Sequence, residues 1–247
     1  MSKRVALVTG GIGGIGTAIC RRLASEGMTV VANYLPALKE EADAWQQAER
    51  EKGFEFALAS GDVADFEDSR RMVQALEAEV GAVDVLVNCA GITRDKSFRK
   101  MEPEQWRAVI ETNLFSVFNV SKQVVEGMTS RGWGRIVNIS SVNGQQGQFG
   151  QTNYSAAKAG VHGFTMALAR ETAAKGVTVN TVSPGYVETA MTADMGEEIL
   201  AQIVASVPVG RMGRPDEVAA CVAFLASEDA AYITGTDLSV NGGFRMG

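Results

Sequence analysis

Short apolar runs rich in β-branched residues alternate with longer segments of helical periodicity along the whole chain. Seven of these runs predict strands, at residues 5–9, 29–33, 55–60, 83–88, 135–140, 178–183 and 237–240. Helical patterns fill the gaps, and Pro103 and Pro215 stand where a helix would have its first turn. Such alternation implies right-handed crossovers, so we expect a doubly wound, mostly parallel sheet of about seven strands with helices on both faces.

The chain is expected to form one α/β domain over residues 1–247, because 247 residues suit one core and the sequence has no linker-like or repeated segment. A formal net charge of −6 argues against a general nucleic-acid or anionic membrane surface. No apolar run approaches the ~20 residues of a membrane span, and the first residues do not resemble a signal peptide. Three widely spaced cysteines and one histidine predict no metal site and a reduced, cytoplasmic protein.

Polar and glycine-rich residues repeatedly follow the ends of the predicted strands. They are residues 9–16, Asn33, residues 61–63, residues 88–91, Ser140, Ser141, Pro184 and Gly185. In doubly wound sheets, ligands bind beyond the carboxyl ends of the strands. Six strand ends of this kind therefore predict one ligand site along a single edge of the sheet, called the rim below.

The first of these strand ends carries T-G-G-I-G-G-I-G at residues 9–16, followed by apolar residues at helical spacing. Strand, glycine turn and helix together are the context in which such a pattern indicates dinucleotide binding. Glycines let a pyrophosphate approach the backbone beside a helix N-terminus. The candidates are Gly10, Gly13, Gly14, Ile15 and Gly16. The alternative is a glycine-rich turn that only packs a helix on the sheet.

Tyr154 and Lys158 stand four residues apart, which places both side chains on one face of a helix. A tyrosine pKa of about 10 is too high for efficient proton transfer near neutrality, and a nearby ammonium lowers it. Ser141 could hydrogen-bond a substrate oxygen at the same point. Alone, the pair could be an ordinary helical pair with a solvated lysine. His162, on the same predicted helix, is expected to be a partly buried structural residue.

With T-G-x-x-x-G-x-G, N-C-A-G, Asn113, Ser141 and Y-x-x-x-K together, the chain resembles the short-chain dehydrogenase/reductase family from residue 5 to residue 243. The resemblance implies a Rossmann fold and a catalytic tetrad of Asn113, Ser141, Tyr154 and Lys158. Tyr154 would protonate a carbonyl oxygen that Ser141 holds, while a nicotinamide supplies hydride. Lys158 would tune Tyr154 and bind the ribose, and Asn113 would hold a water. The family serine lies thirteen residues before the tyrosine, which selects Ser141 over Ser140.

The same resemblance implies further cofactor contacts. Asp62 matches the position that contacts the adenine amino group, and Val63 would line the adenine slot. The remaining candidates are Asn33, Tyr34, Glu40, Asn88, Ala90, Gly91, Pro184 and Gly185. Cys89 replaces the second amide of the usual N-N-A-G, and we interpret it as a small buried residue and not as a reactive thiol.

The choice of nicotinamide is normally made at the end of the second strand, where an acidic residue binds NAD and an arginine accommodates NADP. Asn33 stands there and would by itself admit NADP. However, the glycine loop contains no Arg or Lys. The first cation after the second strand is Lys39, and Glu40 and Glu41 follow it directly. They would oppose a phosphate if they face inward, although acidic residues also begin solvated helices. The balance favours NADH, with NADPH as the alternative.

Within the family, I-T-R-D, G-Q-F-G-Q-T-N-Y-S and N-G-G-F-R-M-G are similar to the branch that reduces acetoacetyl-CoA in polyhydroxybutyrate synthesis. This resemblance implies reduction of acetoacetyl-CoA to (R)-3-hydroxybutyryl-CoA, although most members of that branch use NADPH. It also implies a set of substrate contacts: Asp95, Lys100, Gln148, Phe149, Gln151 and Tyr186. Residues 187–209 are expected to form a substrate lid.

Two other functions remain open. Residues 94–100 carry four cations and one anion, which suits coenzyme A phosphates, an acidic carrier protein or merely a solvated loop. A 3-oxoacyl-[acyl-carrier-protein] reductase would have the same tetrad. A non-catalytic nucleotide sensor is a third possibility, but it would not need a tuned proton donor. The family resemblance also implies a homotetramer, consistent with predicted helices that are apolar on more than one face.

Overall fold

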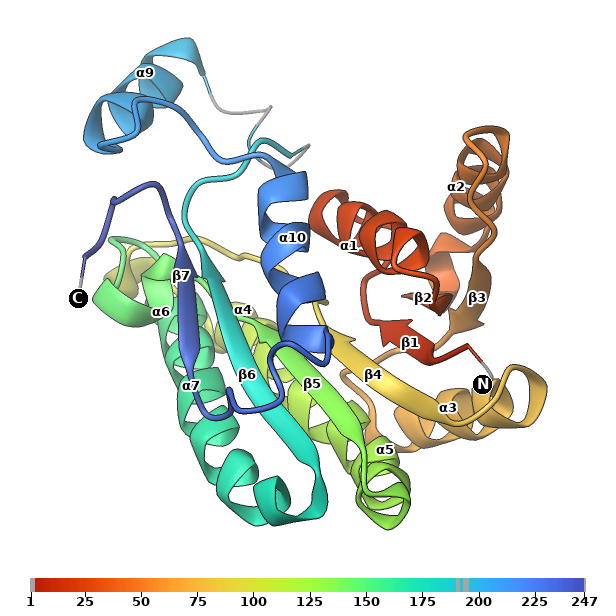
Figure 1. Ribbon diagram of the computed structural model, residues 1–247. Helices are drawn as coiled ribbons and strands as arrows, with labels where there is room; N and C mark the ends of the chain where they lie inside the picture. The colour runs from red at the N-terminus through yellow and green to blue at the C-terminus, as the bar shows by residue number, and fades with distance from the viewer. Residues whose placement is uncertain (1–2, 190–191, 193–195, 247) are drawn as a thin grey trace.

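The computed structural model describes residues 3–189, 192 and 196–246, and it contains one seven-stranded parallel sheet in the order β3-β2-β1-β4-β5-β6-β7 (Figure 1). The strands are β1 (Val5–Val8), β2 (Thr29–Tyr34), β3 (Ala57–Ser60), β4 (Val83–Asn88), β5 (Gly134–Ile139), β6 (Val177–Pro184) and β7 (Asp237–Val240). Each predicted strand is present, with ends shifted by no more than two residues. The sequence prediction of a doubly wound α/β fold is thus confirmed.

Helices connect the strands and cover both faces of the sheet. They are α1 (Gly14–Ser25), α2 (Lys39–Glu51), α3 (Phe66–Glu79), α4 (Pro103–Ile110), α5 (Ser116–Arg131), α6 (Val142–Gln146), α7 (Thr152–Thr172), α9 (Glu197–Ser206) and α10 (Pro215–Ala226). Short 3₁₀ turns lie at η1 (Pro36–Leu38), η2 (Phe98–Lys100) and η4 (Ala173–Lys175), and a π-helical turn, η3 (Glu111–Phe115), joins α4 to α5. Pro103 and Pro215 are the first residues of α4 and α10, as predicted.

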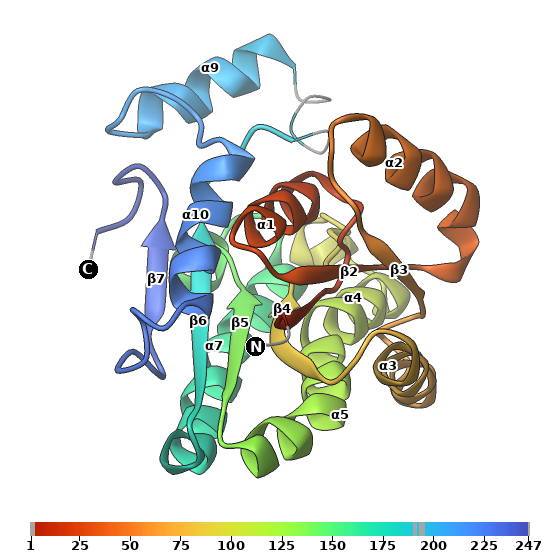
Figure 2. The ribbon, with the colours of Figure 1, turned by 45° about the vertical axis from the view of Figure 1, so that its right-hand side comes forward.

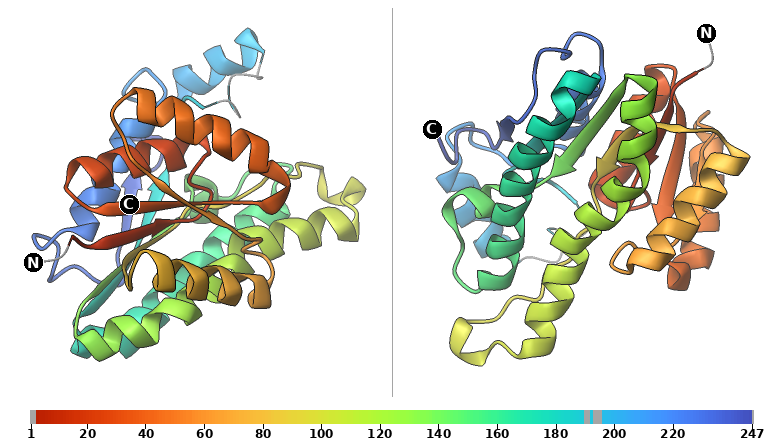
Figure 3. Two further views of the ribbon diagram at one scale, coloured as in Figure 1. Left: turned by 90° about the vertical axis from the view of Figure 1, so that its right-hand side faces the viewer. Right: turned by 90° about the horizontal axis from the view of Figure 1, so that it is seen from below.

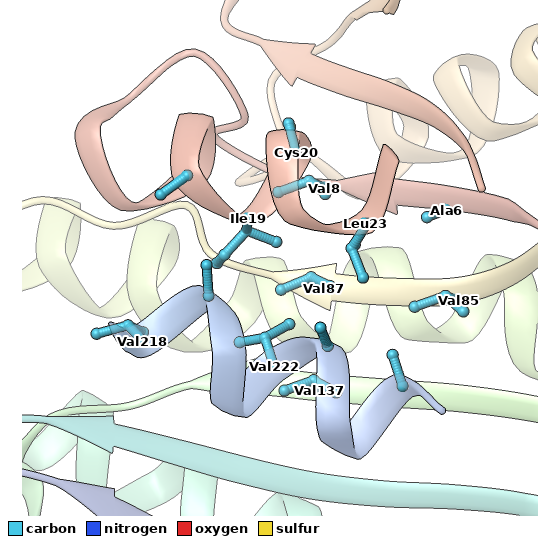
Figure 4. Packing of buried hydrophobic residues seen from close by; sticks show 14 of the residues in the cluster. Ala6, Val8, Ile19, Cys20, Leu23, Val85, Val87, Val137, Val218 and Val222 are labelled. Atoms are coloured by element: carbon cyan, nitrogen blue, oxygen red, sulfur yellow. The ribbon is translucent and has the colours of Figure 1, made fainter. Parts of the chain in front are cut away.

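The strands are apolar on both sides because both sides of the sheet are covered. In β1, Ala6 and Val8 belong to the apolar cluster under α1 and α10, which Figure 4 shows from close by. The alternate residues, Val5 and Leu7, belong to a second cluster with side chains of α3 and α5. Figure 3 shows these two helical layers on opposite faces of the sheet. Successive side chains of a strand point to opposite faces, so one strand builds both halves of the core.

The strand order reverses beside β1, which pairs with both β2 and β4. The carboxyl ends of β5, β6 and β7 point toward the side on which α9 lies (Figure 2). In doubly wound sheets, ligands bind in the crevice beyond these carboxyl ends, beside the point where the strand order reverses.

None of the helices within the described ranges is long and apolar enough to cross a membrane. Nor do the described residues gather three or more His, Cys, Asp or Glu side chains that could hold a metal ion.

Candidate active site

The glycine loop between β1 and α1 has backbone atoms where side chains would not fit. Gly10 has a φ of +61°, and a Cβ there would lie 2.9 Å from Cα of Ala90. A Cβ on Gly16 would lie 2.3 Å from the carbonyl oxygen of Gly10. The Gly13 N–H donates to that same oxygen at 3.1 Å. The loop therefore presents a bare backbone next to the N-terminus of α1, which suits a pyrophosphate.

Asn33 has a task that the sequence did not suggest. Its side chain is buried, its Oδ1 accepts from the N–H of Gly10 at 3.2 Å, and its Nδ2 donates to the carbonyls of Ala59 and Gly61 at 3.2 and 3.0 Å. Both ends of the amide are thus used inside the protein, and they tie the glycine loop to the end of β3. The expected contact of Asn33 with the cofactor stays a prediction.

The other residues expected around the adenosine lie beside this point. Tyr34 is buried at the end of β2, and Glu40 is exposed in the first turn of α2. Lys39, the cation before Glu40, donates to the carboxylate of Asp43 on the same helix. Asp62 is partly buried after β3, where its Oδ1 accepts from the N–H of Ala64 at 2.9 Å. Tyr34 and Asp62 thus follow or end neighbouring strands, and the expected contact of these residues with an adenosine stays a prediction.

The end of β4 carries the N-C-A-G segment. The hydroxyl of Thr9 accepts from the N–H groups of Cys89 and Ala90 at 3.0 and 3.1 Å, which fixes this segment against β1. Asn88 is buried and donates to Oδ1 of Asn138, its register partner on β5, at 2.8 Å. Cys89 packs against the core, and burial raises the pKa of its thiol to about 11. Cys89 packs against the core as predicted but is only partly buried, whereas the sequence predicted a buried residue.

Tyr154 and Lys158 lie in the first two turns of α7, on one face of the helix. Lys158 is 4% exposed, and its Nζ lies 5.6 Å from the centre of the Tyr154 ring. The Nζ donates a hydrogen bond to the carbonyl oxygen of Ile139, at the end of β5, at 2.8 Å. Burial of the ammonium lowers the pKa of Lys158 to about 8, because desolvation penalises the charged form. The lysine is thus held by the sheet directly beside the tyrosine.

The pKa of Tyr154 differs from the sequence-based expectation. Burial raises this pKa to about 12, more than a hydrogen bond with Ser141 lowers it, and the charge of Asp95 adds to the rise. The expected decrease rested on the charge of Lys158, whereas burial of the phenol has the largest effect on this pKa. A high pKa keeps the phenol protonated at neutral pH, which is the form a proton donor needs.

Ser141 stands at the N-cap of α6, where its Oγ accepts from the N–H of Asn143 at 3.1 Å. The hydroxyl has one hydrogen of its own, and this bond does not use it. That hydrogen can therefore be donated to an oxygen at the site. Ser141 also lowers the pKa of Tyr154, so the two side chains lie near each other at the rim.

Asn113 is fully buried in the π-helical turn η3. Its Nδ2 donates to the carbonyls of Ile92 and Val109, both at 2.9 Å, which turns its Oδ1 toward Gly91. A Cβ on Gly91 would lie 2.6 Å from that Oδ1 and 3.6 Å from Nζ of Lys158. Among the described residues, this buried oxygen has no hydrogen-bond partner. Gly91 thus leaves space beside both an acceptor and an ammonium.

Two loops border the open side of the site, and their backbones meet where the N–H of Lys96 donates to the carbonyl of Gly150 at 2.9 Å. Gln151 donates to Asp95 at 2.7 Å and accepts from the amide of Asn143 at 2.9 Å. Two of the predicted substrate residues, Asp95 and Gln151, are therefore hydrogen-bonded to each other. Gln151 is also bonded to Asn143, which was not predicted as a site residue. Their neighbours Lys100, Gln148 and Phe149 are exposed, Phe149 by 89%.

The segment expected to form a lid begins shortly after β6. Pro184 ends β6 and Gly185 follows it, and the ring of Tyr186 packs edge-on against Phe244 with centroids 5.5 Å apart. Of residues 187–209, residues 190–191 and 193–195 lie outside the described part of the chain. Helix α9 occupies most of the segment after residue 195, and the N–H of Val209 donates to the carbonyl of Gly242 at 3.1 Å.

Behind Ser141 and Lys158 lies a polar cluster that was not predicted from the sequence; it contains Ser140, His162, Ser183 and Asp237. Two signals were present in the sequence: the doubled serine at 140–141, and a histidine four residues after Lys158. The distances between these side chains depend on three strands, which sequence spacing does not provide.

Comparison with known proteins agrees with this geometry. A family model described as short chain dehydrogenase matches residues 4–200. The chain is 61% identical to an acetoacetyl-CoA reductase of Allochromatium vinosum, over 98% of this chain and 99% of the relative. It is 57% identical to an acetoacetyl-CoA reductase of Cupriavidus necator over the full length of both. A 3-oxoacyl-[acyl-carrier-protein] reductase of Vibrio cholerae is 47% identical, over 100% of this chain and 99% of the relative. The chain therefore belongs to the short-chain dehydrogenase family.

Proposed function

We propose that the protein reduces acetoacetyl-CoA to (R)-3-hydroxybutyryl-CoA with a nicotinamide cofactor. The observation that carries the proposal is Lys158, buried beside Tyr154 and Ser141 at the rim, in a chain that is 57–61% identical over nearly its whole length to two acetoacetyl-CoA reductases. Acid-base residues, a bare glycine loop and a helix N-terminus lie along one edge of the sheet. This combination suits reduction of a carbonyl group.

The cofactor supplies the hydride, and residues of the chain bind and protonate the carbonyl oxygen of the substrate. Tyr154 is protonated at neutral pH, since burial raises its pKa to about 12, and it donates its phenolic proton to the substrate carbonyl oxygen. Ser141, whose Oγ already accepts from Asn143, donates its own hydrogen to that oxygen. This bond stabilises the negative charge as it develops.

Lys158 and Asn113 supply Tyr154 with a new proton from solvent, because the donated proton leaves with the product alcohol. The Lys158 ammonium has three N–H groups and gives one to Ile139, so the others can serve a ribose hydroxyl and a water. The Asn113 Oδ1 lies across Gly91 from that ammonium and accepts the same water. Gly91 is needed because a side chain there would fill this path.

NADH is the proposed electron donor, with NADPH as the alternative. The glycine loop lacks Arg and Lys, and Lys39 pairs with Asp43 on its own helix. Glu40 and Glu41 occupy the first turn of α2, beside the end of β2. A phosphate at this corner would lack a free cation in the described residues nearby and would be opposed by two carboxylates.

The coenzyme A portion is proposed to lie across the exposed loop of Arg94 to Lys100. Arg94, Lys96, Arg99 and Lys100 are all exposed there, in a chain of net charge −6. This favours a ligand with phosphates. Residues 187–209 would cover the acyl end as a lid, supported by the position of α9 on the rim side (Figure 2). A cytoplasmic location belongs to the same proposal and is supported by three free cysteines.

The main alternative substrate is an acyl-carrier-protein thioester, since a relative with that name is 47% identical over nearly full length. Nicotinamide absorbance should be followed with NADH or NADPH, first with acetoacetyl-CoA and then with the acetoacetyl carrier protein. We expect a higher kcat/KM for acetoacetyl-CoA and for NADH. A higher value with the carrier protein would make the alternative correct. If the nicotinamide is oxidised with neither substrate, the protein either reduces another carbonyl compound or is a nucleotide sensor.

A homotetramer is the proposed assembly. Trp106, Phe115, Phe118 and Met166 are 40 to 53% exposed on α4, η3, α5 and α7. Trp106 and Phe115 line a hollow of about 510 Å³ together with Pro103 and Ile110. Exposed aromatic side chains on adjacent helices are typical of a subunit contact. Light scattering should give four times the mass of the chain, and a monomer would overturn this assignment.

A further inference from the structure

His162 lies one helical turn after Lys158 on α7 and reaches the strands behind the tetrad. Its Nε2 lies 2.7 Å from Oγ of Ser140, after β5, and 3.3 Å from Oγ of Ser183, in β6. An oxygen of Asp237, in β7, lies 3.6 Å from the same nitrogen. A single ring nitrogen therefore faces polar groups of three neighbouring strands.

The hydrogen bonds of the two serines decide which form of the ring is present. Ser140 donates its hydroxyl hydrogen to the carbonyl oxygen of Lys158 at 2.9 Å, and Ser183 donates its own to Oδ1 of Asp237 at 2.6 Å. Each hydroxyl has one hydrogen, so both oxygens can only accept from the ring. Nε2 of His162 must therefore carry the hydrogen.

This cluster touches two members of the tetrad through their main chains. Ser140 directly precedes Ser141, and its hydroxyl is bonded to the carbonyl of Lys158. Helix α6, which begins after Ser141, is held at its far end because Gln145 donates to the second carboxylate oxygen of Asp237 at 2.6 Å. Between these points α6 lies on α7, since a Cβ on Gly144 would lie 2.8 Å from the carbonyl carbon of Lys158.

We propose that His162, with Asp237, is a positioning residue for the reduction. Its Nε2–H bridges Ser140 and Ser183, and this bridge fixes the main chain of Lys158 and the cap at Ser141 relative to the edge strand β7. Loss of the bridge lets α6 and α7 shift against each other, and a small misplacement of acid-base groups costs rate. This inference rests on the proposed reductase activity.

The charged groups that face the ring are Asp237 on β7, Arg245 in the C-terminal segment and Lys158 on α7 itself. Burial, the largest influence, lowers the pKa of His162, so the ring is neutral at neutral pH. Acidification adds a proton at Nδ1 and leaves the Nε2–H donor in place. The bridge therefore persists in both protonation states, which distinguishes it from a pH switch.

Two substitutions of similar size test the role of the donor. Glutamine at position 162 places an N–H near the position of Nε2, whereas leucine fills the space without a donor. We expect His162→Leu to lower kcat about tenfold with the KM for NADH within twofold, and His162→Gln to stay within about threefold of the unmodified protein. Equal kcat values in the two variants, whether both normal or both reduced, would overturn the proposal.

A second measurement does not depend on activity or on the leucine variant folding. His162 is the single histidine of the sequence, so ¹⁵N-histidine labelling of the untagged protein reports on this ring alone. We expect the two-bond proton–nitrogen pattern of the Nε2–H tautomer at neutral pH, and Ser140→Ala should change the Nε2 chemical shift. An Nδ1–H tautomer would overturn the proposal. If the unmodified protein reduced no acetoacetyl-CoA, the proposed function would fail while this measurement still tested the bridge.

Discussion

On the β1–β2 side of the rim the backbone itself forms the surface, whereas on the side from β4 to β6 buried polar side chains form it. In the first region, bare glycines approach each other closely, and the amide of Asn33 is bonded at both ends. In the second region, Asn113, Asn143 and Gln145 each have a buried oxygen without a hydrogen-bond partner among the described residues. The first region is suited to a ligand that must lie against the main chain. The second has polar atoms available for waters, substrate and protons.

The largest loss of activity is expected from a substitution in the second region. Tyr154→Phe removes the proton donor and leaves the ring in place, so we expect kcat to fall about 10³-fold, within the range for loss of a general acid. Steady-state kinetics with acetoacetyl-CoA measure this. NADH binding, followed by fluorescence, and thermal unfolding serve as controls and should remain unchanged. A variant with more than a tenth of the normal kcat would assign the proton to another group.

In the first region, we expect the effect of a substitution to follow backbone clearance. Gly16→Ala puts a Cβ 2.3 Å from the carbonyl oxygen of Gly10, so the free energy of unfolding should fall by about 3 kcal/mol. Gly13→Ala is the matched control, because its Cβ meets that oxygen at 3.4 Å and its φ is −75°. Denaturant unfolding without cofactor should show a loss below about 1 kcal/mol for the control. Equal losses of stability in the two variants would mean that backbone clearance does not determine where the loop requires glycine.

Asn33→Asp tests whether the side chain at position 33, in the first region, faces the protein interior or the ribose. An ionised carboxylate at this position would face the carbonyls of Ala59 and Gly61 where an N–H₂ group now donates. We expect the free energy of unfolding to fall by about 2 kcal/mol, with no gain in preference for NADH.

The control for this prediction is Glu40→Gln, on the exposed first turn of α2. It should change stability by no more than about 0.5 kcal/mol and raise the use of NADPH relative to NADH. A stable Asn33→Asp variant with a stronger preference for NADH would mean that the side chain at position 33 does face the ribose.

Near neutrality pH should have little effect, and the second region should respond only above pH 8. The pKa of Lys158 is lowered to about 8, so the ammonium is present below that pH and lost above it. The rate of reduction should be steady near neutrality and fall about tenfold per unit well above pH 8. Tyr154 keeps its proton throughout this range. Circular dichroism at each pH is the control for unfolding, and a flat profile to pH 9.5 would contradict the role of the lysine.

Much of the candidate site could be predicted because its signals are local. Strand, glycine turn and helix follow one another within residues 5–25, and Tyr154 and Lys158 share a helix face through their spacing alone. The pKa of Tyr154 could not be predicted in the same way, because it depends on how deeply the ring lies between loops far apart in sequence. The role of Asn33 depends likewise on β3, about 25 residues away, which supplies the carbonyls that its amide binds.

The sequence by itself determined the alternation of strands and helices, the glycine loop and the family, and it named the candidates for the tetrad. Periodicity and short-range turn geometry act within a few residues, so they can be read along the chain. The tertiary structure alone decided that Asn33 faces inward, that burial governs the pKa values of Tyr154 and Lys158, and that His162 bridges three strands. Desolvation and hydrogen bonding depend on which distant segments surround a group, and only the packed sheet and its helices bring those segments together.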